Sequence, residues 1–248
     1  MRVSCQLLFP ALLVLCACTA TARAGAEEQE WRWRLTPYLW APSAEGTLKL
    51  DGIGGGSEDD GGSALDKLTG GALLSVEARR GSWSVVGDVI WAQFTQQGTL
   101  DSPSAAPFEA QSDELVIGLG VARALTNHDG LQLDGVVGLR YFHADLSLET
   151  RGGSGVDLSA RADLLDPFLG LRARVGGESG PFVLTYGDVG GFGVSSDLTW
   201  QALLGAGWAW SWGDVRLGWR AIAYDFDSGG ILYDLTARGP FAGVSFAF

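Results

Sequence analysis

Apolar and polar residues alternate with a period of two along most of this chain. The clearest case is LTWQALLGAGWAWSW, in which Leu198, Leu204 and Trp208 fall on one face and Thr199 and Gln201 on the other. A period of two is typical of a β-strand, whose successive side chains point to opposite faces. Several such segments run to about ten residues or more, the length that a tilted strand needs to cross a bilayer. The pattern predicts long strands with one apolar face.

Two kinds of connection separate these strands. Short turns such as 126–130 alternate with longer segments rich in Gly, Ser and Asp, such as 51–63, 98–112 and 148–157. Short periplasmic turns and longer extracellular loops alternate in this way in outer-membrane barrels. We therefore expect an all-β fold, a single antiparallel transmembrane β-barrel of about ten strands (8–12 possible). The expected strands are 31–48, 71–80, 82–96, 112–125, 130–146, 159–175, 181–190, 196–212, 214–226 and 232–248.

Residues 43–70 leave alternatives open. SAEGTLKLDG also reads as a separate strand, and SALDKL as one helical turn. The alternative for the whole chain is a soluble β-sandwich or lipocalin-like barrel, whose strands also alternate. Soluble strands are typically 5–6 residues, which is shorter than these. Trp208, Trp210 and Trp212 also stand at one end of their strand, as an interfacial aromatic girdle would. Both features favour the membrane barrel.

The first 24 residues have the layout of a secretory signal. Arg2 precedes an apolar run from Leu7 to Ala17, and small residues around Ala22 and Ala24 suit cleavage after Ala24. We expect residues 1–24 to be a signal peptide and 25–248 the barrel; lipoprotein processing at Cys18 is the alternative. The cysteines all lie in this segment, so the mature chain is expected to lack disulfides and thiol chemistry.

The amino-acid composition disfavours two classes of protein, nucleic-acid-binding proteins and helical membrane proteins. The chain has 17 basic and 29 acidic residues, a net charge of −12, which disfavours nucleic-acid binding because phosphate affinity comes from Lys and Arg. The 37 glycines and 10 tryptophans fit strands and membrane interfaces better than helices. No later stretch reaches 18 uninterrupted apolar residues, so a helical membrane protein is not expected.

The C-terminal strand is apolar at every second residue and ends on Phe248. GPFAGVSFAF resembles the signal by which barrel proteins are recognised for outer-membrane insertion, with Phe246 and Phe248 as its aromatic residues. Together with PYLWAP, LLDPFLGLR and GDVGGFGVSSDLTWQ, it resembles a family of uncharacterised outer-membrane β-barrel proteins of Gram-negative bacteria. This resemblance implies a fold and a location in the outer membrane, but no activity. The expected partners are membrane lipid, lipopolysaccharide and the barrel-assembly machinery, and the expected state is a monomer.

If the apolar faces point to lipid, charged residues point into the lumen. Buried charges must be paired, and arginine is well suited to pair with carboxylates. One interpretation is an internal salt-bridge network that fills a narrow barrel, in which case the protein is a structural scaffold. The other is an arginine-lined constriction, in which case it is a narrow porin-like channel for small, possibly anionic solutes. The inward aromatic residues expected are Tyr38, Trp40, Phe94, Phe142, Phe168 and Tyr224. The expected charges are Arg32, Arg34, Glu77, Arg79, Asp88, Arg140, Asp166, Arg172, Arg174, Arg216 and Arg220.

The segment GDVGGFGVSSD invites a phosphate-loop interpretation, but a strand follows it where that motif needs a helix. A tight outer turn with positive φ is the better interpretation. Its members are Asp188, Gly190, Gly191, Gly193 and Asp197, and its two aspartates are expected to cap the turn or pair with lumen arginines.

Other chemistry is weakly indicated. Glu58, Asp59 and Asp60 offer carboxylates but lack calcium-loop spacing, so a solvated acidic loop is preferred over a loose cation site. His143 with Ser147 or Ser154 is the one candidate for a lipid-modifying enzyme, a minor alternative without a supporting motif. We expect no enzyme activity, no cofactor and no metal.

Overall fold

The computed structural model describes residues 30–50, 57–63, 68–99, 107–150, 157–228 and 231–248. The predicted signal peptide lies outside these residues. No helix in the described part of the chain is long and apolar enough to span a membrane.

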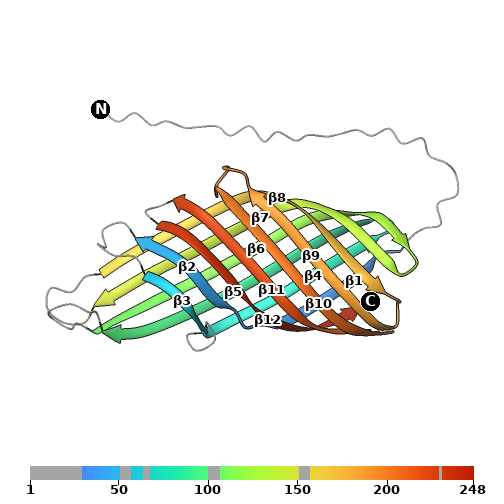
Figure 1. Cartoon of the computed structure of the whole chain (residues 1–248), viewed down its shortest axis with the longest axis horizontal. Helices are drawn as coiled ribbons and strands as arrows, with labels where there is room; N and C mark the ends of the chain where they lie inside the picture. Colours follow the sequence, from blue (N-terminus) through green and yellow to red (C-terminus); the bar gives the residue numbers. More distant parts are fainter. Residues whose placement is uncertain (1–29, 51–56, 64–67, 100–106, 151–156, 229–230) are drawn as a thin grey trace.

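The described chain forms strands that wind around a common axis with a strong tilt (Figure 1). Every pairing between neighbouring strands is antiparallel. The strands are β1 (Arg32–Trp40), β2 (Ser43–Leu50), β3 (Ser57–Ser63), β4 (Leu68–Arg80), β5 (Trp83–Thr99), β6 (Pro107–His128), β7 (Leu131–Thr150), β8 (Asp157–Gly176), β9 (Gly180–Gly191), β10 (Leu198–Trp210), β11 (Gly213–Ser228) and β12 (Ile231–Ala247).

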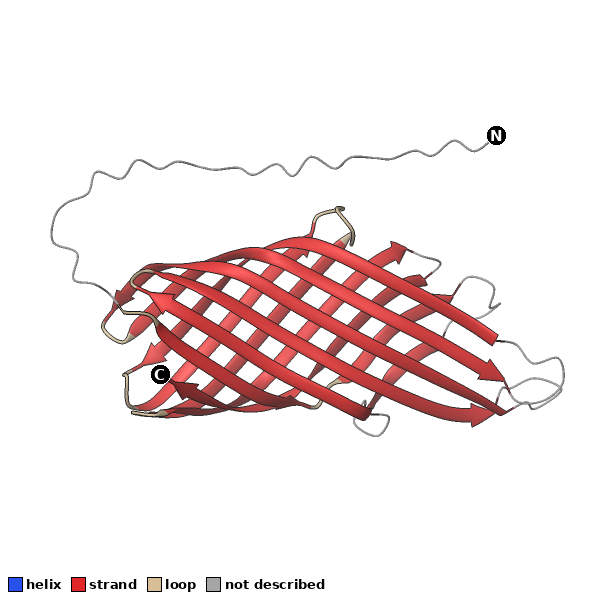
Figure 2. Ribbon diagram, turned by 180° about the vertical axis from the view of Figure 1, so that it is seen from behind, coloured by secondary structure: helices blue, strands red, loops and turns tan. Residues whose placement is uncertain are grey.

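The sheet closes on itself where β1 pairs with β12. Near this junction β1 and β2 lie one after the other along β12, so they occupy a single position in the wall. β3 pairs with β2 and β4 with β1, so β3 and β4 likewise share one position. The predicted ten-stranded antiparallel barrel is thus confirmed, and its closed wall can be followed from behind in Figure 2.

Several boundaries differ from the prediction. The expected strand 31–48 is interrupted at Ala41 and Pro42, and its second part is the separate strand β2. Part of the expected loop 51–63 is strand β3. The described parts of the expected loops 98–112 and 148–157 are also strand (98–99, 107–112, 148–150 and 157), because β5, β6, β7 and β8 continue beyond the length that a bilayer requires. The proposed helical turn at SALDKL falls largely outside the described residues.

Short turns gather at the end of the barrel that holds the C-terminus (Figure 1). In the turn after β6, Asp129 and Gly130 both have positive φ, 51° and 76°, as two-residue type I′ hairpins require. The backbone of Phe248 exchanges two hydrogen bonds with Trp33, at 2.8 and 3.0 Å, so the last residue is held in the wall. Short turns mark the periplasmic end of such barrels.

The outer surface carries an apolar belt bounded by aromatic residues. Leu119, Val137, Leu169 and Leu217 are among its members, and each exposes more than half of its side chain. Aromatic side chains border this belt at both ends, as in the girdles of membrane barrels. A closed barrel with this exterior lies in the outer membrane. The aromatic border residues are Trp31, Trp33, Trp83, Trp208, Trp210 and Trp212 at the periplasmic end and Trp91 and Tyr141 at the outer end.

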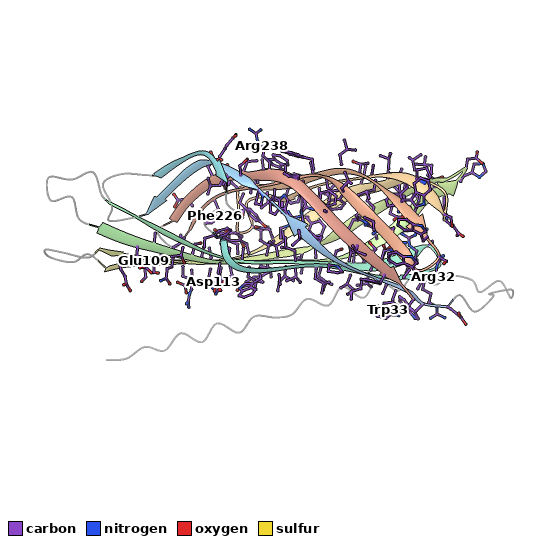
Figure 3. All side chains as sticks on the ribbon, turned by 90° about the horizontal axis from the view of Figure 1, so that it is seen from below. Arg32, Trp33, Glu109, Asp113, Phe226 and Arg238 are labelled. Atoms are coloured by element: carbon purple, nitrogen blue, oxygen red, sulfur yellow. The ribbon has the colours of Figure 1, made fainter. Side chains whose placement is uncertain are left out.

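Beyond Trp91 and Tyr141 the outward side chains become polar. β5 to β8 continue there as a four-stranded sheet, which we call the outer extension (residues 93–99, 107–113, 143–150 and 157–163). Asp113 and Glu109 point away from the lumen on its surface (Figure 3). β6 has 22 residues, about twice the 9–11 that a transmembrane strand needs. The extension therefore stands outside the outer leaflet.

β9 and β10 are shorter than their neighbours and leave a gap in the wall. The β8–β9 ladder stops at Phe168 and Gly190, although β8 begins at Asp157. Pro167, which has no N–H to donate, stands where that ladder ends. The β7–β8 ladder passes Pro167 without a bulge. The β9–β10 turn, residues 192–197, occupies the gap.

Candidate functional site: the charged lumen

The lumen contains a cavity of about 1710 Å³ that opens at the periplasmic turns. Its lining runs from Gly81, Gly130 and Ser211 at the mouth to Arg140 and Arg220 inside. We call this cavity the vestibule. The sequence-predicted charges Arg32, Arg34, Glu77, Arg79, Asp88, Arg140, Arg172, Arg174, Arg216 and Arg220 all line it.

One ion-pair group at the inner end of the vestibule joins four strands. Arg220 of β11 donates to Asp88 of β5 at 2.6 Å and to Gln201 of β10 at 3.1 Å, and it also bonds the hydroxyl of Tyr38. Tyr38 of β1 donates in turn to both oxygens of Asp88 at 3.1 Å. β5 is separated from β10 and β11 by several other strands of the wall, so the group ties distant parts of the wall together.

A second ion pair lies beside the first. Arg140 of β7 donates to Asp188 of β9 at 2.6 Å and to the hydroxyl of Thr199 at 3.1 Å. The side chain of Arg140 is 5% exposed and that of Asp188 is fully buried. The ring of Phe168 lies against the same guanidinium, 5.0 Å away. The sequence placed Asp188 at the outer turn, where it was expected either to cap the turn or to pair with a lumen arginine. In the structure it pairs with the lumen arginine Arg140.

A third group is built around a carboxylate that the pattern analysis did not single out. Asp134 of β7 is buried and accepts hydrogen bonds from Arg79 at 2.6 Å and Arg172 at 2.7 Å. Glu77 accepts from the same two arginines, at 3.1 and 2.6 Å. Asp134 falls at an inward position of its strand, two residues from Gln132, so strand parity alone would have placed it here.

Asp214 is the second missed carboxylate. It is 1% exposed, and both of its oxygens accept hydrogen bonds from Arg216, at 2.7 and 2.8 Å. Two further arginines approach the same Oδ2 atom, Arg34 at 3.5 Å and Arg174 at 4.0 Å. The sequence did not identify Asp214 as a lumen residue because it directly follows a periplasmic turn, and turn residues are commonly polar without facing a lumen.

Asp166 has a different role from the one expected. It is buried, and it accepts hydrogen bonds from the backbone amides of Ser195 and Ser196 and from the Ser196 hydroxyl, at 3.0, 2.9 and 2.6 Å. No ion pair of Asp166 with an arginine occurs among the described residues. Asp166 therefore anchors the β9–β10 turn.

The turn itself has the backbone that its glycines suggested. Gly191, Phe192 and Gly193 have positive φ, 87°, 55° and 72°. Gly190 has ordinary strand geometry but leaves no room for a side chain, because an added Cβ would lie 2.6 Å from the carbonyl oxygen of Pro167. Asp197 joins the end of the turn to β11, because its backbone amide donates to the carbonyl of Asp225 at 3.0 Å.

An apolar cluster fills the lumen beyond the two inner ion pairs. Phe142 and Tyr224 lie with ring centroids 4.7 Å apart, and Phe142 and Phe226 5.7 Å apart. Phe226 projects between the two walls in Figure 3. Trp40 and Val116 pack against the cluster from other strands. We call this cluster the plug; its buried members are Ile90, Phe142, Ala144, Ala162, Leu164, Ile222, Tyr224 and Phe226.

Phe142, Tyr224 and Phe226 do not line the vestibule, which ends on the polar layer beneath them. The interior therefore has two zones: a charged chamber open to the periplasm and an apolar plug toward the outside. The six inward aromatic residues expected from the sequence divide between these zones. Phe142 and Tyr224 are in the plug and Trp40 packs against it, whereas Tyr38 and Phe168 line the vestibule. Phe94 belongs to β5, on the inward side of its strand.

His143 lies on the outer surface just beyond the apolar belt. Its Nδ1 is 2.8 Å from Asp163 Oδ1, and the Tyr141 hydroxyl donates to the same oxygen at 2.6 Å. The hydrogen bond from Tyr141, followed by that from His143, lowers the pKa of the Asp163 carboxyl. Ser147 is four residues along the strand, roughly 13 Å away at the usual rise, so it is out of reach of His143. Ser154 and the side chains of Glu58, Asp59 and Asp60 lie outside the described residues.

No family model and no curated protein matches the chain. Among solved structures, it is similar to Ail, the attachment invasion locus protein of Yersinia pestis, at 12% identity over 89% of this chain and 99% of that one, with a TM-score of 0.39. It is also similar to the transport unit of the autotransporter AIDA-I from Escherichia coli, at 8% identity over 92% of each chain and a TM-score of 0.42. Neisserial surface protein A has 13% identity over 88% of this chain and 97% of that one, with a TM-score of 0.33. Similarities this weak assign no ligand or activity.

Proposed function

We propose that this outer-membrane barrel is a closed scaffold that holds the outer extension at the cell surface and passes no solute. The plug carries the proposal. Its side chains come from β5, β7, β8 and β11 and meet inside the lumen, with Phe142 and Phe226 2% and 1% exposed. Two inner ion pairs, Arg220–Asp88 and Arg140–Asp188, lie directly beneath it.

The energetics favour a permanently closed lumen. Removing one large aromatic side chain from a packed core costs about 3–5 kcal/mol. Opening a continuous path requires separating Phe142 from Tyr224 and Phe226 and breaking buried ion pairs as well. A water-filled channel would need neither the aromatic packing nor the buried ion pairs, so their presence favours a closed lumen.

Under this proposal, the exposed strands of the outer extension take the place of extracellular loops as the functional surface. The outward side chains there are polar, and most of the charged ones are acidic, among them Glu109, Asp113, Asp145 and Asp163. Lipid and lipopolysaccharide contact the belt, the assembly machinery recognises the C-terminal strand, and the barrel works as a monomer without a cofactor or enzymatic activity. Membership of the uncharacterised barrel family suggested by the sequence motifs is part of the same proposal.

Conductance in planar bilayers tests the closed state. The wild-type barrel should be silent, whereas Phe226→Ala, with its fold verified by heat-modifiable gel migration, should admit small conductance steps. Leu217→Ala, which removes an outward side chain from the same strand, is the matched control and should stay silent. Regular channel openings in the wild-type barrel would contradict the proposal.

Surface labelling tests the orientation. The cysteines of the sequence all lie within residues 1–18, so a single cysteine introduced at Asp113 gives an unambiguous signal. A membrane-impermeant maleimide should label Asp113→Cys on intact cells, but should label Glu178→Cys, in a periplasmic turn, only after permeabilisation. The reverse pattern would place the outer extension in the periplasm.

One observation favours a narrow channel as the second candidate. The vestibule already covers the periplasmic part of a solute path, and its wall carries more arginines than carboxylates. If the plug moves, an anion would meet a positively charged wall. Wild-type conductance with anion selectivity is the result that would replace the scaffold by this channel.

A further inference from the structure

The wall of the vestibule carries more positive charge than its own carboxylates neutralise. Between the periplasmic mouth and the two inner ion pairs, the described residues include six arginines that line the cavity and three carboxylates. The arginines are Arg32, Arg34, Arg79, Arg172, Arg174 and Arg216, and the carboxylates are Glu77, Asp134 and Asp214. Glu30, Glu178 and the carboxylate of the last residue, Phe248, also line the cavity and add negative charge at its rim.

The surplus is concentrated at Asp214. Arg216 already occupies both oxygens of this carboxylate with two hydrogen bonds. Arg34 and Arg174 approach the same Oδ2 atom at 3.5 and 4.0 Å, and neither guanidinium makes a hydrogen bond with the described part of the chain. Three arginines thus surround one carboxylate, which leaves two positive charges in excess. We call this group the Asp214 cluster.

Phe182 holds the Asp214 cluster in place through its aromatic ring, which leaves the N–H donors of the arginines unused. The guanidinium carbon of Arg174 lies 3.5 Å from the centre of the Phe182 ring, and that of Arg216 lies 5.9 Å from it. A cation–π contact uses the face of a guanidinium and leaves the N–H groups at its edge available. Gly207 makes room for this ring, because an added Cβ would lie 2.5 Å from it.

The cluster is accessible from the vestibule. The side chains of Arg34, Arg174 and Arg216 are 36%, 20% and 18% exposed, whereas the side chain of Asp214 is only 2% exposed. The free donors therefore face the open chamber, while the carboxylate stays beneath them. The chamber, at about 1710 Å³, easily holds a small solute.

We propose that the Asp214 cluster is a binding site for a phosphate group that enters from the periplasm, with Arg34 and Arg174 as its principal donors. Two excess positive charges match the charge of a phosphate or phosphate monoester, about −1.5 to −2 at neutral pH. Planar guanidinium groups bind tetrahedral phosphate through paired N–H donors, and such charge-assisted hydrogen bonds are about twice as strong as neutral ones. The site does not depend on whether the plug opens.

Isothermal titration of the purified mature barrel in a non-ionic detergent, at low salt, tests this site. Inorganic phosphate and glycerol 3-phosphate are the probes. Saturable binding is expected for the wild type, and Arg34→Gln or Arg174→Gln should each weaken it about tenfold, a typical loss for one charge-assisted contact. Arg161→Gln, on the outer surface, is the matched control and should leave binding unchanged. The folded state of each variant is checked by heat-modifiable gel migration.

Asp214→Asn is a variant for which phosphate affinity is expected to increase. Because it removes the competing carboxylate, it should tighten phosphate binding, and phosphate should raise its unfolding midpoint more than that of the wild type. A merely structural arginine cluster would lose stability in this variant without gaining affinity. Absence of saturable binding, or equal binding by the wild type and both arginine variants, would overturn the proposal.

The same titration in nanodiscs separates the two sources of a phosphate group. If a soluble phosphate compound is the ligand, the affinity for glycerol 3-phosphate should be equal in zwitterionic and anionic nanodiscs. If lipid headgroups of the inner leaflet reach the cluster, anionic phospholipid should compete and weaken the apparent affinity.

Discussion

Ser196 donates its backbone amide to one oxygen of Asp166 and its hydroxyl to the other, and both residues are buried. The contact joins the β9–β10 turn to β8 beyond the point where the β8–β9 ladder has ended. A carboxylate with three donors, one of them from Ser195, therefore seals a gap between two strands of unequal length.

We predict that Asp166→Ala releases this turn. Hydrogen bonds to a charged group contribute about 1.5–3 kcal/mol each, and their loss leaves buried amides without partners. The turn should then be cut by an added protease on intact cells, which the wild type should resist. Asp197→Ala is the control, because its turn contact uses the backbone amide. Equal cleavage of both variants would show that Asp166 does not hold the turn, and Asp166→Asn should give an intermediate result.

The Arg140–Asp188 pair should be one of the most sensitive positions in the lumen. Removing one partner of a buried pair costs about 3–5 kcal/mol, because the other charge is left uncompensated. Asp188→Asn should therefore lower the urea midpoint for unfolding in lipid vesicles by a large amount. The exposed pair Arg238–Glu45 provides the comparison, and Glu45→Gln should cost about 0–1 kcal/mol. A small effect for Asp188→Asn would indicate that water reaches the pair and would weaken the closed-lumen proposal.

Phe248 should be required for assembly. Its side chain is 74% exposed at the lipid-facing end of the last strand, so Phe248→Asp places a charge in the belt and alters the aromatic terminus. We expect a clear loss of barrel from outer-membrane fractions. Phe192→Asp is the matched control, since Phe192 is 54% exposed at the opposite end. Equal yields would refute a special role for the terminal residue.

Ser245, on the opposite face of the last strand, is a poor control for the same experiment. It is fully buried, and its hydroxyl lies 2.8 Å from that of Thr36 across the β1–β12 junction. Ser245→Ala should cost about 1 kcal/mol of stability and leave targeting intact. Measuring yield and unfolding midpoint together separates these two effects.

Asp225 should make the outer rim of β11 sensitive to pH. Partial loss of hydration, followed by the carboxylates of Asp234 and Asp197, raises the pKa of Asp225 above its usual 3.8. A raised pKa means that Asp225 is tolerated best when protonated, so stability is highest below about pH 3.8 and falls as pH rises through the folded-state pKa. Asp225→Asn should raise the unfolding midpoint slightly at pH 7 and leave it unchanged near pH 3. The gain should be below about 1 kcal/mol, because exposed charges are screened.

Asp227→Asn serves as the comparison for this pH series. Asp227 is also exposed and stands opposite Leu232, whereas Asp225 stands opposite Asp234. It should show no gain at either pH. A gain of equal size for both variants would point to net charge instead of the Asp225–Asp234 contact.

The sequence by itself determined the class of fold and the direction of most side chains. In a barrel strand each side chain points either to lipid or to the interior, and the two directions alternate. Leu204 and Trp208 could therefore be assigned to lipid and Thr199 to the interior from the local pattern alone. The ten strands and the inward arginines follow from the same rule. The ends of the strands could not be predicted from this rule. The strands of the outer extension remain paired although their outward side chains are polar, and polar segments rich in Gly and Ser also occur in loops.

Only the tertiary structure decided which inward residues meet. Arg140 and Asp166 are neighbours in the β7–β8 register, yet Arg140 reaches across to Asp188 and Asp166 turns to Ser195 and Ser196. Closure of the barrel and the unequal strand lengths set these distances, and neither is encoded in local periodicity. The division of the lumen into an open charged vestibule and an apolar plug has the same origin. It arises because side chains from opposite walls, far apart in sequence, compete for one confined volume.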